Sequence, residues 1–305
     1  MLSFSAKTKN ELCRAGTGRA CCRTAELYGM LLFGGAFSNR EIRLVSEQAA
    51  IVRRAALLLD KVCGVSVQPV TAGRRRVLRL TAPDEIAAVM EHMGYDFRSY
   101  VTYHLNRNVV ENDCCAAAFL RGAFLMAGSA ASPEKKSHLE IQTGHAVLAR
   151  EVMSLLLDLG LAPKIAERRA TWLLYWKQSA KIEDFLTLIG ARHAALAIME
   201  AKVEKQLRGE INRKVNCETA NLIKVTSTST KQIAAIERAL AVGGLEVFPE
   251  NLRQTVDLRV ANPAASLSEL AAMFDPPISK PGLSHRLGRI MEIAARVTQP
   301  EGGGT

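Results

Sequence analysis

An apolar run rich in small residues occurs twice in the chain and constrains its architecture more than any other feature. The first copy is CCRTAELYGMLLFGGAF, residues 21–37, and the second is CCAAAFLRGAFLMAGSA, residues 114–130. The matched identical pairs are Cys21 and Cys114, Cys22 and Cys115, Ala25 and Ala118, Leu27 and Leu120, Gly29 and Gly122, Leu32 and Leu125, and Gly35 and Gly128. A duplication of this kind predicts two similar structural units.

Each copy is long enough for about four helical turns and carries glycine inside the predicted helix. A glycine within a helix costs about 1 kcal/mol relative to alanine, so another interaction must compensate. The most economical compensation is a second backbone that approaches closely. We therefore expect the two helices to pack against each other.

The segments that follow the two copies repeat one order of elements. After the first copy the patterns predict a strand at 41–47, a helix at 48–63, strands at 65–70 and 75–80, and a helix at 83–92. After the second copy they predict a strand at 137–143, a helix at 146–159, strands at 163–169 and 171–176, and a helix at 179–189. The repeated order predicts one pseudo-symmetric α/β (α+β) domain over residues 1–198, with lobes at about 21–110 and 111–198.

This order, with its paired helical motifs, resembles the LAGLIDADG homing endonuclease fold. The resemblance implies two motif helices at a pseudo-twofold axis and two sheets that form a saddle over duplex DNA. It also implies a metal-binding acid near the end of each motif helix, at the positions held here by Gly34 and Ala127. Since Mg²⁺ needs hard oxygen ligands, these two residues predict a nuclease scaffold without nuclease chemistry.

Charge favours a polyanionic partner. The chain holds 40 Lys and Arg against 30 Asp and Glu, a formal net charge of +10. Basic chains attract nucleic acids through phosphate contacts, although a solvated basic surface has the same composition. The clusters in or beside the predicted strands form a candidate second surface for DNA or a partner: Arg40, Arg43, Arg74, Arg75, Arg76, Arg79, Lys135, Lys136, Arg168 and Arg169.

The seven cysteines include no CxxC pair and no Cys/His set of zinc spacing, so no metal and no cofactor are expected. The doublets Cys21-Cys22 and Cys114-Cys115 stand near the predicted helix starts, where a lowered thiol pKa would suit a redox role. Burial of small residues at a repeat interface is the alternative. No apolar run is long enough to cross a membrane, and residues 1–10 lack a signal-peptide core, so a cytoplasmic protein with no membrane partner is expected.

The pattern changes after the repeats. Residues 199–230 are polar, which predicts a linker. KVTSTSTK at 224–231 indicates a linker or a helix start, and a helix is expected from 231 to 241. Further helices are expected at 249–260, after the capping box Ser266–Glu269, and after Ser279. Leu283, Leu287 and Ile290 form an apolar stripe on the last of them.

The final pair of helices fits a helix-turn-helix domain over residues 231–298, followed by a flexible tail at 299–305. A three-helix module used only for packing is the alternative. The candidate DNA-binding residues of the helix-turn-helix are Ser268, Ser279, Lys280, Ser284, His285, Arg286 and Arg289.

Longer segments narrow the resemblance. They are FSAKTKNEL, RACCRTAELYGMLLFGGAF, CCAAAFLRGAFLMAGS, FLTLIGA, NRKVNCETANLIK and LRVANPAASLSELAAMFDPPISKPGLSHRLGRI. Over nearly its whole length the chain resembles the WhiA family of bacterial sporulation and cell-division regulators. That resemblance implies a degenerate LAGLIDADG-like domain joined to an all-α helix-turn-helix domain.

The resemblance also implies a sequence-specific DNA-binding transcriptional regulator, linked to sporulation or to cell division and chromosome segregation. The expected partners are double-stranded promoter DNA and another transcription factor or an RNA polymerase component, at the nucleoid in the cytoplasm. Pro281 and Gly288 depart from the polar or basic residues that relatives usually carry in the recognition helix. Two alternatives remain open: a metal-dependent DNA endonuclease, and a protein- or RNA-binding scaffold.

Overall fold

The computed structural model describes residues 2–98 and 103–298, which divide into two compact units. The first unit ends at Gln206 and the second begins at Leu207, within the segment expected to be a linker. Helix α8 (Arg192–Gly243) contributes residues to both units. The expected tail at 299–305 lies outside the described residues.

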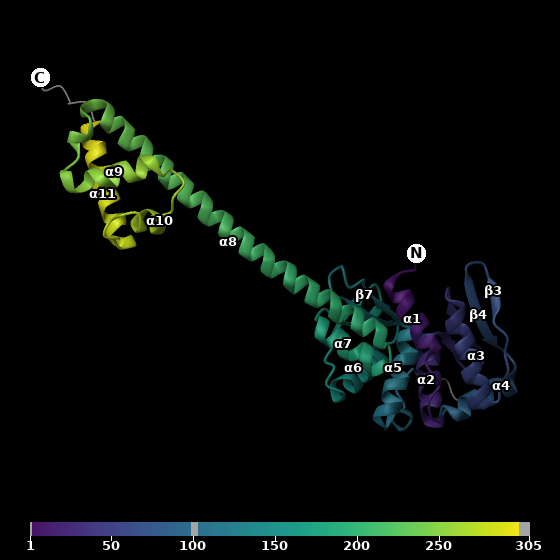
Figure 1. Ribbon diagram of the computed structural model, residues 1–305. Coiled ribbons are helices and arrows are strands. Elements are labelled where there is room, and N and C mark those ends of the chain that lie inside the picture. The colour runs from purple at the N-terminus through teal and green to yellow at the C-terminus, as the bar shows by residue number, and fades with distance from the viewer. Residues whose placement is uncertain (1, 99–102, 299–305) are drawn as a thin grey trace, which may run out of the picture. The chain divides into compact units, whose positions relative to one another are not determined.

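The first unit contains the two lobes that the repeat predicts (Figure 1). The first lobe comprises α1 (Phe4–Arg14), α2 (Ala20–Phe33), β1 (Gly35–Phe37), β2 (Ile42–Ser46), α3 (Ala49–Cys63), β3 (Val70–Ala72), β4 (Arg75–Leu80) and α4 (Pro83–His92). The second comprises η1 (Arg107–Val110), α5 (Asp113–Ala127), β5 (Gly128–Ala130), β6 (Leu139–Thr143), α6 (Ala146–Asp158), β7 (Lys164–Arg168), β8 (Thr171–Trp176) and α7 (Ser179–Ile189).

The two lobes have the same sheet topology. Their antiparallel sheets have the strand orders β1-β2-β4-β3 and β5-β6-β8-β7. In β2, β4 and β6 the buried residues alternate with more exposed ones, so one face of each sheet packs on helices. The pseudo-symmetric two-lobed fold expected from the repeat is therefore confirmed.

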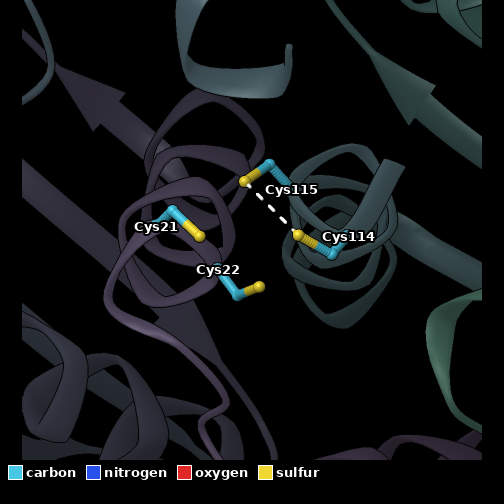
Figure 2. A group of neighbouring side chains, drawn as sticks. All are labelled: Cys21, Cys22, Cys114 and Cys115. Carbon is cyan, nitrogen blue, oxygen red and sulfur yellow. Dashed lines mark hydrogen bonds between the residues drawn. The ribbon is translucent and has the colours of Figure 1, made fainter. Parts of the chain in front are cut away.

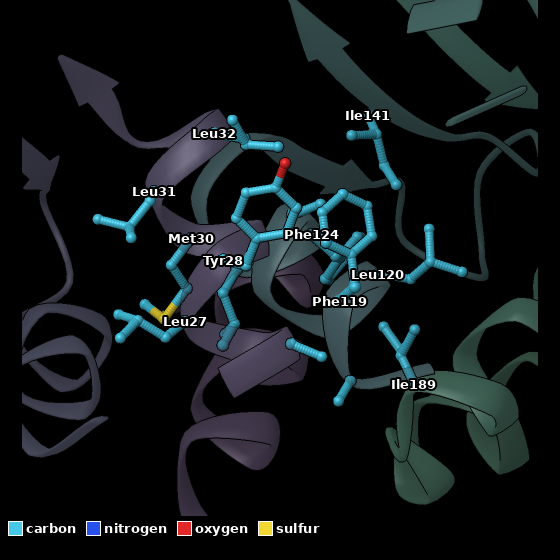
Figure 3. Packing of buried hydrophobic residues seen from close by; sticks show 14 of the residues in the cluster. Leu27, Tyr28, Met30, Leu31, Leu32, Phe119, Leu120, Phe124, Ile141 and Ile189 are labelled. Carbon is cyan, nitrogen blue, oxygen red and sulfur yellow. The ribbon is translucent and has the colours of Figure 1, made fainter. Parts of the chain in front are cut away.

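Helices α2 and α5 pack side by side between the two sheets, as their glycines predict (Figure 1). The Tyr28 and Phe119 rings lie 5.7 Å apart between centroids, and leucines from both helices surround them (Figure 3). These side chains belong to one continuous apolar core that both lobes share.

Both motif helices have about the four turns that the sequence predicts. Helix α2 ends at Phe33 and α5 ends at Ala127, and the remaining residues of the two apolar runs form β1 and β5. Gly35 adopts a φ of +145°, which L side chains rarely reach, and so lets the chain leave the helix and pair with β2.

Two segments differ from their sequence patterns. The strand expected at 65–70 lies instead at Val70–Ala72, directly after Pro69, which has no N–H to donate to a ladder. Residues 199–230 are helical throughout and KVTSTSTK does not start a helix. Glu, Lys, Gln and Arg in residues 200–214 are strong helix formers and do not need a continuous apolar face to support a helix.

The second unit continues from α8 into η2 (Leu245–Val247), α9 (Glu250–Ala261), α10 (Leu267–Ala272) and α11 (Lys280–Val297). Its core gathers Ile236, Leu252, Leu270 and Leu283, one residue from each of its α-helices. The predicted capping box at Ser266 and Glu269 and the predicted cap at Ser279 are both present. Across the described residues, no helix is both long and apolar enough for a membrane span.

Candidate nucleic-acid interface

The ends of the two motif helices, where the resemblance described above implies metal-binding acids, flank a surface hollow of about 350 Å³. Its lining is apolar or neutral: Leu32, Phe33, Gly35, Met126, Ala127, Gln142, Thr143, Gly144, His145 and Thr171. None of these described residues is an acid. Burial lowers the pKa of His145 below its ordinary value, so its imidazole is neutral at neutral pH.

The space for an acid at Gly34 is already occupied. A Cβ built at Gly34 would lie 2.2 Å from Leu44 Cδ2 and 2.5 Å from the Met30 carbonyl oxygen. A carboxylate side chain would therefore displace a buried core leucine and the helix backbone. Neighbouring atoms therefore fill the place where a side chain at position 34 would stand.

Glu26, the acid within α2, is committed to structure. Its side chain is fully buried, and its carboxylate accepts hydrogen bonds from Arg54 Nε, from Arg54 Nη2 at 2.9 Å and from Arg121 Nη1 at 3.2 Å. Arg54 comes from α3 and Arg121 from α5, so the ion-pair cluster ties both motif helices to the first lobe. A carboxylate satisfied by two guanidinium groups is not available to a metal ion.

The first sheet carries arginines on the face opposite its core. Arg43 and Arg79 are cross-strand partners, and Arg75 lies on the same side four residues from Arg79 along β4. Arg79 Nε also pairs with Glu41 Oε1 at 2.7 Å, which neutralises part of this charge. Alternation instead places the half-buried Arg76 on the side of Leu78, toward the core, so it does not join the exposed row.

Loop cations extend this surface in both lobes. Arg40 lies between β1 and β2, Arg74 lies in the β3–β4 turn, and Lys135 and Lys136 lie between β5 and β6; all four are exposed. Arg168 ends β7. Arg169 follows it in a two-residue turn in which Arg169 and Ala170 have φ values of 50° and 59°.

The outer face of the second sheet is less basic than that of the first. Glu140 occupies this face and accepts a hydrogen bond at 2.9 Å from His138 Nε2 in its N–H tautomer. Tyr175 is the cross-strand partner of Glu140, and the Lys177 ammonium lies 5.4 Å from the Tyr175 ring centroid. The duplicated sheets therefore present unequal charge, with the denser arginine row on the first.

Helix α11 separates an apolar face from a polar one. Leu283, Leu287 and Ile290 are buried, as their spacing predicts, whereas Ser284, His285 and Arg289 are exposed on the opposite side. Lys280 is exposed in the first turn, and Pro281 stands in that turn, where it breaks no helical hydrogen bond. Gly288 faces open space.

The remaining candidate DNA-binding residues, Ser279, Arg286 and Ser268, lie at the start of α10 and at or near the start of α11. The Ser279 hydroxyl accepts from Gly282 N at 3.2 Å, which leaves its O–H able to donate. The Arg286 guanidinium carbon lies 5.5 Å from the Phe274 ring centroid, over the turn between α10 and α11. Ser268 is exposed in the first turn of α10.

Arg259 holds the α9–α10 connection in place, a role that the sequence analysis missed. Its side chain is only 2% exposed, and Nη2 donates to the carbonyl oxygens of Asn262 at 2.6 Å, Pro263 at 3.2 Å and Ala265 at 2.9 Å. Desolvation lowers its pKa. A lone arginine in an otherwise ordinary helix pattern gives no signal of this role, because its partners are backbone atoms of a loop.

Comparison with known proteins agrees with this architecture in both units. The family described as "WhiA LAGLIDADG-like domain" matches residues 116–208, and that described as "WhiA C-terminal HTH domain" matches residues 211–294. The chain is 36% identical over 307 residues to "Probable cell division protein WhiA" of Ruminiclostridium cellulolyticum, covering 97% of this chain and 98% of the relative. It is 34% identical over 314 residues to the protein of that name in Alkaliphilus metalliredigens, covering 97% and 98%.

A solved structure extends the agreement to the fold. The crystal structure of full-length WhiA from Thermatoga maritima superposes with a TM-score of 0.61 at 26% identity and covers 98% of this chain and 100% of that one. With a duplicated motif domain, a helix-turn-helix and full-length relatives in agreement, the chain belongs to the WhiA family.

Proposed function

We propose that the protein is a sequence-specific, double-stranded-DNA-binding regulator of transcription. The observation that carries the proposal is the exposed polar face of α11, which presents Lys280, His285 and Arg289 opposite a complete apolar core. A recognition helix reads base edges with its N-terminal half while cations contact phosphates. Ser268, Ser279, Ser284 and Arg286 complete the proposed DNA surface.

The first unit is proposed to support this reader. Its arginine row, Arg43, Arg75 and Arg79, suits a second phosphate contact or an acidic partner such as another transcription factor or an RNA polymerase component. Relatives carry the name "Probable cell division protein WhiA", which supports a proposed role for this chain in cell division. A link to sporulation or to chromosome segregation is proposed from the family resemblance alone. It would act on promoter DNA at the nucleoid, in the cytoplasm.

Removal of two cations from α11 tests the proposal. On a promoter duplex recovered by genome-wide mapping of bound DNA, Lys280→Ala and Arg289→Ala are each expected to weaken binding about tenfold and together about 100-fold, because each charged contact contributes about 1.4 kcal/mol. The slope of log affinity against log salt should fall by about 0.9 for each lost phosphate contact. Fluorescence anisotropy over a salt series measures both quantities.

Lys231→Ala, at an exposed cation of α8 in the same unit, is the matched control and should leave affinity and slope unchanged. A double variant that binds the promoter duplex as the parent does would contradict the proposal. That result would favour a protein- or RNA-binding scaffold instead.

We further propose that the protein lacks nuclease activity. The hollow at the ends of α2 and α5 has a lining without carboxylates, and Glu26 is held by two arginines. Supercoiled plasmid incubated with the purified chain and Mg²⁺ or Mn²⁺ is therefore expected to remain supercoiled on an agarose gel. Nicking that EDTA stops and that follows the protein peak through chromatography would establish the endonuclease alternative.

A further inference from the structure

The duplicated cysteine doublets meet at the starts of the two motif helices. Cys21 and Cys22 come from α2, Cys114 and Cys115 come from α5, and Figure 2 shows the two pairs facing each other. All four Sγ atoms lie within 4.8 Å of one another, and those of Cys114 and Cys115 are 3.9 Å apart. The doublets are 93 positions apart, from Cys21 to Cys114, so only the pairing of the two lobes creates this cluster.

The cluster has nearly the dimensions of a tetrahedral metal site. With Zn–S bonds of about 2.3 Å, sulfurs at the corners of a tetrahedron are about 3.8 Å apart. The largest separation here exceeds that by about 1 Å, which small rotations of the cysteine side chains can close. Four thiolates are a complete ligand set for a structural zinc ion.

The positions of the cysteines in their helices favour thiolates. Helix α2 begins at Ala20 and α5 at Asp113, so each doublet occupies the second and third positions of its helix. Backbone N–H groups and the helix dipole at such ends stabilise negative charge.

An ion has a route to the cluster. Cys21 and Cys115 form part of the wall of a cavity of about 360 Å³, together with polar residues that include His92, Asn106 and Asn112. Cys115 is only 2% exposed, while Cys21 and Cys114 are exposed. The sulfurs are therefore reachable from solvent on one side and bounded by the core on the other.

The geometry points to a tetrathiolate zinc site, formed by Cys21, Cys22, Cys114 and Cys115, that joins α2 to α5 at their N-terminal ends. Zinc fits this set because it accepts four soft thiolates in tetrahedral geometry and needs no redox partner. Binding converts four thiols and Zn²⁺ into a complex of net charge 2− and releases four protons, so charge balances. The two helix N-termini, each about half a positive charge, offset the remaining negative charge.

CxxC and Cys/His spacings, whose absence predicts no metal, describe ligands that one local segment supplies. Here two vicinal pairs from different lobes supply them. The signal in the sequence is the repetition of the doublet at the same position of two helices that pack together.

The test uses the full-length chain, reduced and stripped of metal. Zn²⁺ titrated against a chromophoric chelator is expected to bind at one equivalent per chain. Co²⁺ should bind at the same stoichiometry and give the sulfur-to-metal charge-transfer and intense visible bands of tetrahedral tetrathiolate coordination. The zinc-loaded protein should also unfold at a higher temperature than the apo form, since zinc binds the folded state preferentially.

Cys22→Ser combined with Cys115→Ser should lower zinc affinity by at least about 100-fold and abolish the cobalt bands. Cys217→Ser is the matched control, because it makes the same change at an exposed cysteine of α8 outside the cluster, and it should retain both. Three results would overturn the inference: no stoichiometric zinc, cobalt bands without tetrathiolate character, or disulfides joining the doublets that persist in a reducing buffer. The cobalt spectrum of the unaltered chain decides the question even if the double variant does not fold.

Discussion

Glu26→Ala is expected to lower the free energy of unfolding of the first unit by about 3–5 kcal/mol. The substitution leaves the Arg54 guanidinium, whose side chain is 3% exposed, buried without its counter-ion. Removing one member of a buried ion pair is far more costly than the pair is stabilising, because the remaining charge has been taken out of water. Urea unfolding followed by circular dichroism measures the loss.

The matched control is Asp158→Ala, which removes the acid of an exposed pair. Arg107 Nη1 and Asp158 Oδ2 are 3.0 Å apart, but the side chains are 50% and 62% exposed. Exposed pairs of this kind contribute about 0–1 kcal/mol. If Glu26→Ala costs no more than Asp158→Ala, the arginine cluster around Glu26 does not hold the motif helices as described.

Gly122→Ala is expected to destabilise the first unit by about 3 kcal/mol, against the usual trend in helices. A Cβ at Gly122 would lie 2.1 Å from the Glu26 carbonyl oxygen and 2.9 Å from Met30 N, so α2 and α5 would have to move apart. Overpacking against backbone atoms outweighs the gain of about 1 kcal/mol that alanine normally brings to a helix. Gly29→Ala should behave alike, since its Cβ would lie 2.2 Å from the Phe119 carbonyl oxygen.

Gly209→Ala provides the control for helix propensity alone. Gly209 lies within α8, and a Cβ there would meet no atom within 4 Å. This variant should be stabilised by up to about 1 kcal/mol in the same thermal or urea measurement. Equal and favourable effects at Gly122 and Gly209 would contradict the close approach of the motif helices.

Helix α8 differs from the linker that local sequence patterns predict. Residues 199–230 have no continuous apolar face, a pattern that predicts a linker. Strong helix formers instead keep the helix unbroken, because an apolar face is only one source of helix stability. The domain limits at 198, 230 and 298 stay predictions, because the helix crosses the first two without a break.

The arginines of β4 and of the turn before it show a second limit of prediction from sequence, which concerns the direction of side chains. Arg74, Arg75, Arg76 and Arg79 lie close together in the sequence. The sheet face that each side chain occupies can be assigned only when the strand register is known. The pairing of Arg76 with Ser46 and Thr71 puts it on the core side, away from Arg75 and Arg79. Basic residues that are close along a strand can therefore be assigned to one surface patch only from the strand register.

The sequence alone determined the duplicated architecture, the helical packing at Gly29 and Gly122, the capped helix-turn-helix and the absence of acids at Gly34 and Ala127. Each of these features depends on residues that are close in the sequence or on the internal repeat, so local sequence patterns are sufficient to predict it. Only the tertiary structure decided the burial of Glu26 between Arg54 and Arg121, the closing of Leu44 over Gly34, and the meeting of the four cysteines. These features join residues distant in the chain, and the packing of the two lobes, rather than any local pattern, sets the distances between them.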